Sequence, residues 1–209
     1  MTQTSMSEPP LFPRDRASFL NLAGGFEAML VLIGLGLAWL TGLDVWDMLS
    51  FSRRACVAGL VATLPPLIVF GITYRWPIGP LRTIKDFLRE SLGAPLAACR
   101  WYDLALVAAM AGIGEELLFR GVMQTGISHW AGPAAGLLIA STVFGFAHAV
   151  TLTYALLAGL IGLYLGGLLF LEESPNLLIP IMVHGLYDFV AFLVIRADYR
   201  IRRLGEAAS

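Results

Sequence analysis

The residues best placed to do chemistry in this sequence are Glu115, Glu116 and Arg120, which lie in an otherwise apolar stretch from Trp101 to Gln124. A charge near the middle of a bilayer costs about 2.5 to 3.5 kcal/mol, so three within six residues require compensation or a function. Glu116 and Arg120 are four residues apart and share a helical face, so they can form an ion pair. Glu115 points elsewhere and has no local partner, which suits a general base. We interpret the three as part of an active site, with helix pinning as the simpler alternative.

Two later segments each carry a histidine one helical turn from an aromatic or acidic residue. Phe144 and His148 share one face, and His184 and Asp188 share another. A single histidine in a membrane helix usually serves as an interhelical hydrogen-bonding group, but two on different helices predict a cluster with Glu115 inside the bundle. One observation opposes this prediction. His148 lies near the cytoplasmic end of its segment, whereas Glu115 lies deeper unless its helix tilts or begins later.

The composition is that of an integral membrane protein. Of the 209 residues, 57% are hydrophobic and 14% are charged, whereas charged residues make up about a quarter of a soluble domain. Six stretches approach the roughly 20 apolar residues that a membrane span needs. They are residues 19–43, 56–74, 101–124, 132–150, 152–171 and 177–195. We therefore predict an all-α, polytopic transmembrane helix bundle with about six spans.

The basic residues predict the orientation of this bundle. With six spans both termini lie on one side, and that side carries eleven Lys and Arg residues. The opposite side carries only Arg53 and Arg54. The positive-inside rule then places both termini in the cytoplasm. We expect a multi-pass plasma membrane protein, and the short loops suit a bacterial inner membrane.

The chain is expected to form one domain. Residues 1–17 are predicted to be a flexible cytoplasmic tail, residues 18–195 the transmembrane bundle and residues 196–209 a basic cytoplasmic tail. Apolar residues recur at helical spacing over residues 81–92, which predicts an interfacial amphipathic helix. For this helix we favour an anchoring role over substrate docking. Glu27, an acid within the first span, is expected to be structural.

Three motifs follow one another on successive predicted spans. Glu-Glu-x-x-x-Arg, Phe-x-x-x-His and His-x-x-x-Asp are individually weak signals, but their order is specific. Together they resemble the CPBP family of intramembrane proteases, which includes the CAAX prenyl endopeptidases and the bacteriocin-processing or Abi proteins. The resemblance covers roughly residues 100–190, with the motifs inside 101–190.

The resemblance implies an endopeptidase that hydrolyses a peptide bond of a membrane-associated protein or peptide. In such enzymes the residues that match Glu115 and His148 activate a water molecule, and those that match His184 and Asp188 stabilise the oxyanion. Phe144 is expected in the substrate pocket. An ionised aspartate cannot donate a hydrogen bond to an oxyanion, so Asp188 either carries a proton or orients and charges His184.

The same side chains permit a zinc site. Two imidazoles and two carboxylates, from Glu115, His148, His184 and Asp188, would be enough ligands. However, the sequence contains no His-Glu-x-x-His that would fix two ligands on one helix. We favour a glutamate mechanism without a metal or other cofactor, and keep the zinc-dependent version of the same protease as an alternative.

Other functional classes leave different signatures. No Gly-x-Ser-Gly or Gly-x-Gly-Asp motif supports a serine or aspartyl intramembrane protease. No internal repeat of broken helices supports a transporter. A non-catalytic membrane partner, such as an immunity or scaffold protein, remains open. The expected partners are the lipid bilayer and a membrane-anchored or lipidated substrate, with no nucleic acid, and we expect a monomer.

Overall fold

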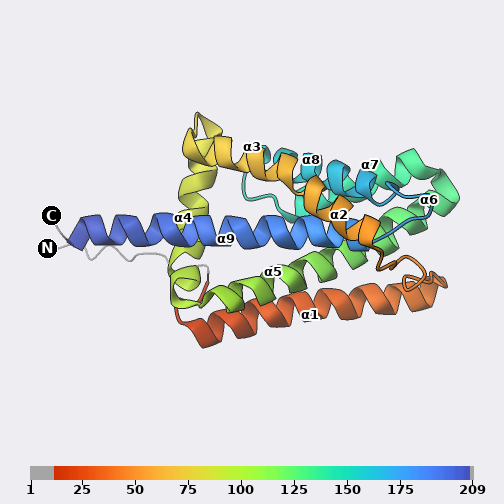
Figure 1. The fold of residues 1–209 in the computed structure, drawn as a ribbon, viewed down its shortest axis with the longest axis horizontal. Coiled ribbons are helices and arrows are strands. Elements are labelled where there is room, and N and C mark those ends of the chain that lie inside the picture. The colour runs from red at the N-terminus through yellow and green to blue at the C-terminus, as the bar shows by residue number, and fades with distance from the viewer. Residues whose placement is uncertain (1–11, 208–209) are drawn as a thin grey trace, which may run out of the picture.

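The computed structural model describes residues 12–207, and this part of the chain contains helices and no strand (Figure 1). The elements are α1 (Arg16–Thr41), α2 (Arg53–Ala62), α3 (Leu64–Arg75), α4 (Pro80–Ala98), α5 (Trp101–Glu116), the π-helix η1 (Leu117–Gln124), α6 (Thr125–Ala131), α7 (Pro133–Ala147), α8 (Leu152–Leu168) and α9 (Leu178–Ala207). The prediction of an all-α bundle is therefore confirmed. Most of the predicted tail of residues 1–17 lies outside the described residues, and α1 already begins at Arg16.

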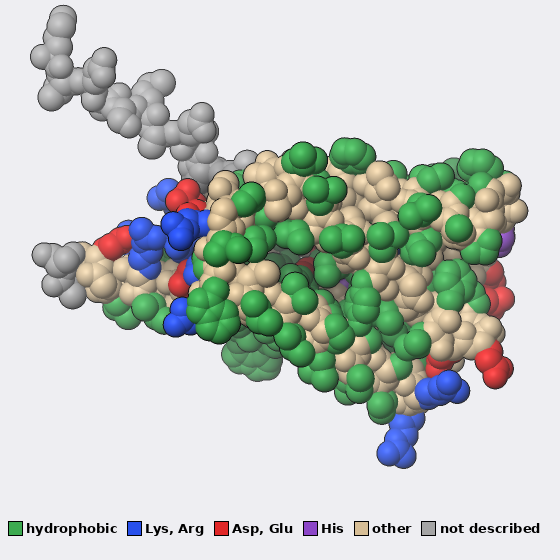
Figure 2. Space-filling view, turned by 90° about the horizontal axis from the view of Figure 1, so that it is seen from above, with side chains coloured by type: hydrophobic (Ala, Val, Ile, Leu, Met, Phe, Trp, Pro, Cys, Tyr) green, Lys and Arg blue, Asp and Glu red, His purple; other side chains and the backbone are tan. Residues whose placement is uncertain are grey.

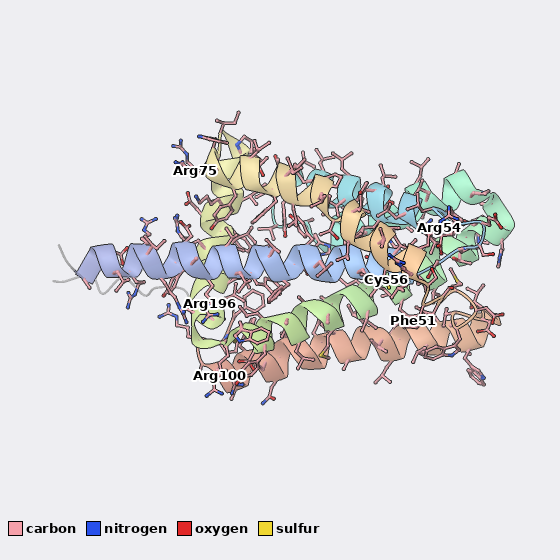
Figure 3. The ribbon with its side chains drawn as sticks, in the orientation of Figure 1. Phe51, Arg54, Cys56, Arg75, Arg100 and Arg196 are labelled. Atoms are coloured by element: carbon pink, nitrogen blue, oxygen red, sulfur yellow. The ribbon has the colours of Figure 1, made fainter. Side chains whose placement is uncertain are left out.

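Apolar helices make up the middle of the molecule. Three helical segments are long and apolar enough to cross a membrane, namely α1, the consecutive α2 and α3, and α9, and the shorter α7 and α8 are also apolar. Figure 2 shows hydrophobic side chains over this middle region and charged side chains gathered at the two ends. In Figure 3, Arg75, Arg100 and Arg196 lie at one end and Arg54 lies at the opposite end. This distribution is that of a membrane protein.

The second predicted span is divided into two helices at Thr63. Pro66 has no N–H with which to continue the α-helical hydrogen bonds, so the carbonyl of Ala62 loses its usual intrahelical donor. The Tyr164 hydroxyl of α8 donates to this carbonyl at 2.7 Å. Because a backbone carbonyl in lipid needs a partner, this bond stabilises the break and joins α8 to the α2–α3 junction.

The helical segment of the third predicted span is longer than predicted, and this resolves the difference in predicted depth between Glu115 and His148. The helix passes through η1 and α6 to Ala131, and the chain reverses at Gly132, where φ is +87°. Gly132 lies seventeen residues after Glu115 and sixteen before His148. Since both arms of this hairpin are helical, the two residues return to a similar depth.

Helix α4 crosses α9 near the end of the bundle where α1 begins and α9 ends (Figure 1). A Cβ built on Gly93 of α4 would overlap the ring of Tyr199, and Arg200 donates to the carbonyl of Ala97 at 2.7 Å. The predicted interfacial helix of residues 81–92 thus extends over residues 80–98 and packs on α9. Within the predicted basic tail of residues 196–209, α9 continues as helix to Ala207, and the hydrogen bond of Arg200 supports this part of it.

Helices α5 and α9 touch backbone to backbone beside the candidate site. A Cβ on Gly112 would lie 2.8 Å from the carbonyl oxygen of Ile181 and 2.9 Å from the amide nitrogen of Gly185. In the first turn of α5, Asp103 accepts hydrogen bonds from the guanidinium of Arg16 at 2.6 and 2.7 Å. These contacts fix α5 between α1 and α9, and α5 carries the two adjacent glutamates.

Candidate active site

The candidate residues come together from three parts of the fold. Glu115 and Glu116 end α5, and Arg120 lies in the following π-helix. Phe144 lies in the last turn of α7, and His148 is the C-cap residue of that helix. His184 and Asp188 lie one turn apart on α9. All of them take part in one network of contacts around the two glutamates. The side of this network around Glu116 differs in geometry from the side around Glu115.

Glu116 belongs to the closely bonded side of this network. Its Oε1 accepts a hydrogen bond from Arg120 at 3.0 Å and lies 2.7 Å from Nδ1 of His184. The side chains of Glu116 and Arg120 are 0% and 1% exposed. Arg120 also donates to the carbonyl of Gly162 in α8 at 3.1 Å. An ion pair with additional hydrogen-bond partners is the form in which buried charges are tolerated.

Gln124 continues this side by one more turn. Its amide donates to the carbonyl of Gly166 at 3.0 Å, and a Cβ on Gly166 would come within 2.5 Å of its Oε1. The sequence analysis missed Gln124, although its spacing of four from Arg120 was available as a signal. The intervening π-helix is a form that frequently occurs at functional sites, and nothing in the sequence pattern predicted it. Across this segment Glu116, Arg120 and Gln124 all make hydrogen bonds with neighbouring groups.

Phe144 lies between the two sides of the network. Its ring centroid is 4.5 Å from Cζ of Arg120 and 4.5 Å from the ring of His148. It also packs edge-on against Phe119 at 5.1 Å. Phe144, predicted as a substrate-pocket residue, lines the cavity described below and also covers the buried guanidinium.

Glu115 belongs to the more open side. Its Oε2 lies 3.7 Å from Nε2 of His148 and 3.9 Å from Nε2 of His184. Within residues 12–207 this oxygen has no hydrogen-bond partner. Asp188 Oδ2 lies 3.6 Å from the same Nε2 of His184. These separations exceed the 2.7 to 3.2 Å of a direct N–H···O bond, and polar groups at such distances are commonly bridged by water.

The hydrogen bonds of the two histidines orient their reactive nitrogens. Nδ1 of His148 lies 2.9 Å from the carbonyl oxygen of Phe144. Because a carbonyl only accepts, this Nδ1 carries the proton, and the neutral ring then has its Nε2 lone pair toward Glu115. In His184, Nδ1 donates to Glu116, so Nε2 faces Glu115 and Asp188.

A cavity of about 500 Å³ opens onto this side. Apolar residues of α3, α4, α8 and α9 form most of its wall, and Phe144, His148, His184 and Asp188 also line it. Figure 2 shows a hollow in the apolar face of the molecule with acidic and histidine side chains at its floor. Tyr154 and Tyr187 line the cavity as well and were not predicted. Tyr187 lies inside the His-x-x-x-Asp motif, which was a usable signal, whereas no signal pointed to Tyr154.

Glu27 lies behind the two glutamates. It is 8% exposed, and a Cβ on Gly114 would be 3.0 Å from its carbonyl oxygen and 3.3 Å from its Oε2. The contact brings α1 against the residue that precedes Glu115. The structural role expected for Glu27 remains a prediction.

The four side chains considered for zinc all border the open side. Across residues 12–207, no group of three or more His, Cys, Asp or Glu side chains has a geometry that could hold a metal ion. Both histidines bind through Nδ1 to protein oxygens, as metal-ligating histidines also do.

Comparison with known proteins supports the resemblance found in the motifs. Residues 97–190 match the family model described as type II CAAX prenyl endopeptidase Rce1-like. This segment contains the three motifs and the helices that carry them, α5 to α8 and the first part of α9. No curated protein and no solved structure matches the chain. The family resemblance is thus confirmed for this part of the chain.

Proposed function

We propose that this chain, which carries a type II CAAX prenyl endopeptidase-like domain at residues 97–190, is an intramembrane endopeptidase that hydrolyses a peptide bond of a membrane-associated protein or peptide. The family match supports a CAAX-type endopeptidase in general. The proposal adds the means of catalysis, which is water activated by Glu115 and His148.

One observation carries the proposal. An unpartnered carboxylate oxygen of Glu115 lies 3.7 and 3.9 Å from the imidazole nitrogens of two other helices. These helices meet at the wall of an apolar cavity. A base, a group that orients water and a donor for the developing negative charge are the three roles that peptide hydrolysis requires. The two atoms are close enough for one water molecule beside them to bond to both.

In the proposed reaction, a water molecule lies between Glu115 and His148. Nε2 of His148 accepts a hydrogen bond from this water and orients it. Glu115 takes a proton from the water as the oxygen attacks the carbonyl carbon of the substrate. The new carbon–oxygen bond leaves a negative charge on the former carbonyl oxygen. The carbonyl then re-forms as the carbon–nitrogen bond breaks, and Glu115 gives its proton to the leaving nitrogen. The products are an amine and a carboxylic acid, which keeps the second hydrogen of the water until it ionises.

His184 stabilises the negative oxygen of the tetrahedral intermediate. Glu116 accepts from Nδ1 of His184 and favours its charged form, which donates from Nε2 as well. Asp188, at 3.6 Å from this Nε2, supports the same charge and orients the ring. Arg120 neutralises Glu116, so that Glu116 remains a fixed acceptor and does not compete as a base.

The proposal includes an orientation in the membrane. The chain crosses the bilayer about six times, both termini lie in the cytoplasm, and the cavity is reached from the end that carries α4. The abundance of basic side chains at that end supports this orientation. We propose a monomer as the functional unit, because all the site residues come from one chain.

The test is cleavage of a panel of tagged, membrane-anchored and lipidated substrates by purified protein in detergent. Wild type and Glu115→Gln are compared, with a zinc chelator added to a third sample. The substitution keeps the size of the side chain and removes the base. Product from wild type only, with or without chelator, is the expected result.

Other results have distinct meanings. Loss of product on chelation would replace the proposed mechanism with the zinc-dependent version. Equal product from both proteins would exclude Glu115 as the base. Binding of a substrate without any cleavage by wild type would favour a non-catalytic membrane partner.

A further inference from the structure

Tyr154, in the first turn of α8, lines the same cavity as the candidate catalytic groups. Its amide donates to the side chain of Thr151, the N-cap residue of α8, at 3.1 Å. Its ring lies edge-on to His148, with 6.4 Å between the ring centroids and 81° between the ring planes. The start of α8 thus places this tyrosine on the cavity wall beside the histidine that orients the water in the proposed reaction.

The hydroxyl of Tyr154 is free to donate a hydrogen bond. Two other tyrosines of the cavity lining have bonded hydroxyls, since Tyr74 donates to Asp198 at 3.0 Å and Tyr164 donates to the carbonyl of Ala62 at 2.7 Å. Within residues 12–207, the hydrogen bond found for Tyr154 is that of its amide, and its hydroxyl has none. The hydroxyl is therefore available to a group that enters the cavity.

The open side of the network is rich in acceptors and poor in donors. Asp188 and Glu115 are both near enough to interact electrostatically with Tyr154, and ionised carboxylates only accept hydrogen bonds. Nε2 of His184 faces the same two carboxylates and is one donor, which comes from α9. Tyr154 comes from α8 and lines the same cavity, so the two donors reach it from different helices.

We propose that Tyr154 is a further catalytic residue, whose hydroxyl donates a hydrogen bond to the negative oxygen of the tetrahedral intermediate together with Nε2 of His184. This inference rests on the proposed function and adds a second donor to it. Fixed donors aimed at a developing negative charge lower the barrier of acyl transfer. The tyrosine keeps its proton at neutral pH, so the hydrogen bond transfers none. A ring that only packed against His148 would act equally well without its hydroxyl.

The experiment measures kcat and KM separately for wild type and Tyr154→Phe on one peptide of the substrate panel that wild type cleaves. The substitution keeps the ring beside His148 and removes only the hydroxyl. A donor used only in the transition state predicts that kcat falls about 100- to 1,000-fold while KM changes little. Tyr199→Phe removes a tyrosine hydroxyl outside the cavity lining, so this control should keep both values.

A second tyrosine of the cavity tests whether the effect is specific to Tyr154. Tyr187 also lines the cavity, but its ring packs edge-on against Phe70 of α3 at 5.7 Å, whereas that of Tyr154 packs on His148. Tyr187→Phe should therefore lower kcat much less than Tyr154→Phe. Equal losses in the two variants, or an unchanged kcat in Tyr154→Phe, would overturn the inference and leave the proposed function in place.

A binding measurement separates this inference from the proposed function. One panel peptide and its phosphinate analogue, in which a tetrahedral, negatively charged group replaces the scissile bond, are bound to Glu115→Gln protein with and without Tyr154→Phe. Loss of a hydrogen bond to a charged oxygen predicts that only the phosphinate binds more weakly without the hydroxyl, by about 10- to 100-fold. This result supports the inference even if wild type cleaves no peptide, an outcome that would refute only the protease. Equal changes for both ligands would refute the role of Tyr154 whether or not cleavage occurs.

Discussion

Two adjacent glutamates of one helix have very different surroundings. Glu116 is fully buried and bonded at 2.7 and 3.0 Å, whereas the nearest basic nitrogens of Glu115 lie at 3.7 and 3.9 Å. On the Glu115 side, the side chains of His148 and Asp188 remain 29% and 22% exposed. Short contacts without access to solvent fix a structure, and longer contacts beside a cavity leave room for a reactant. The comparison teaches that adjacent residues of one helix can differ completely in bonding, because a step of one residue turns the side chain toward a different neighbour.

The same substitution at both glutamates would test this comparison most strongly. Glu116→Gln leaves the buried charge of Arg120 uncompensated, so we expect the free energy of unfolding to fall by about 3 to 5 kcal/mol. Glu115→Gln should change it by less than about 1 kcal/mol. Unfolding of both proteins in detergent, followed by circular dichroism, measures the difference. Similar losses at the two positions would show that the two sides are not distinct.

The contact between Gln124 and α8 allows a second test on the framework side. A methyl group on Gly166 would meet Oε1 of Gln124 and a methyl of Leu137 at 2.5 Å. Gly166→Ala should therefore destabilise the protein by about 1 to 3 kcal/mol. Gly167→Ala is the matched control, because a methyl there meets nothing within 4 Å. The midpoint temperature of thermal unfolding should be higher for Gly167→Ala than for Gly166→Ala, and the reverse order would contradict the described packing.

Phe144 contacts the Glu116 side and the Glu115 side of the network, so its replacement should lower both the stability of the protein and the rate of cleavage. Phe144→Leu removes the ring that covers Arg120, at an expected cost of about 1 to 2 kcal/mol in stability. It also removes the ring that packs on His148, so the rate of cleavage should fall in the same protein. Stability and kcat measured on one preparation would test the dual role. A change in only one of them would assign Phe144 to a single side.

The smallest effect is expected at Asp188. Asparagine has the same shape and can donate to an oxyanion or hold the His184 ring, so Asp188→Asn should keep kcat/KM within about tenfold of wild type. Steady-state cleavage of a single substrate measures the ratio. A loss of several hundredfold would mean that the negative charge of Asp188 is needed, and would make this residue part of the base.

Much of the fold could be predicted from apolar stretches, because membrane helices must satisfy their backbone within each segment. The ends of the helices were predicted less well. The third helix continues past Gln124 to Ala131, and α9 continues past Ile195 to Ala207. In both places tertiary contacts support helix where the residues are polar, as between Arg200 and the carbonyl of Ala97. Such contacts are not encoded in local hydropathy.

The spacing of the motifs was enough to predict which residues form the candidate site, but not the distances between their side chains. A spacing of four places Glu116 beside Arg120, and that contact is local. The approach of His148 to Glu115 depends on where the hairpin turns, and only the position of Gly132 shows that the two arms match. The roles given to these residues remain predictions. The amphipathic pattern of residues 81–92 predicted a helix, but its place on the cavity wall depends on how α4 packs in the fold.

The π-helix also affects how the chain tolerates changes in length. A π-helical turn holds one residue more than an α-helical turn, so deletion of one residue within Leu117–Gln124 would allow the segment to become α-helical. The residues before the deletion, including Glu115, would keep their positions, while the exact site of the deletion would decide which of Arg120 and Gln124 still faces α8. Deletion of a single codon in this segment would therefore rotate the residues after the deletion about the helix axis relative to those before it. The polypeptide on either side would remain helical.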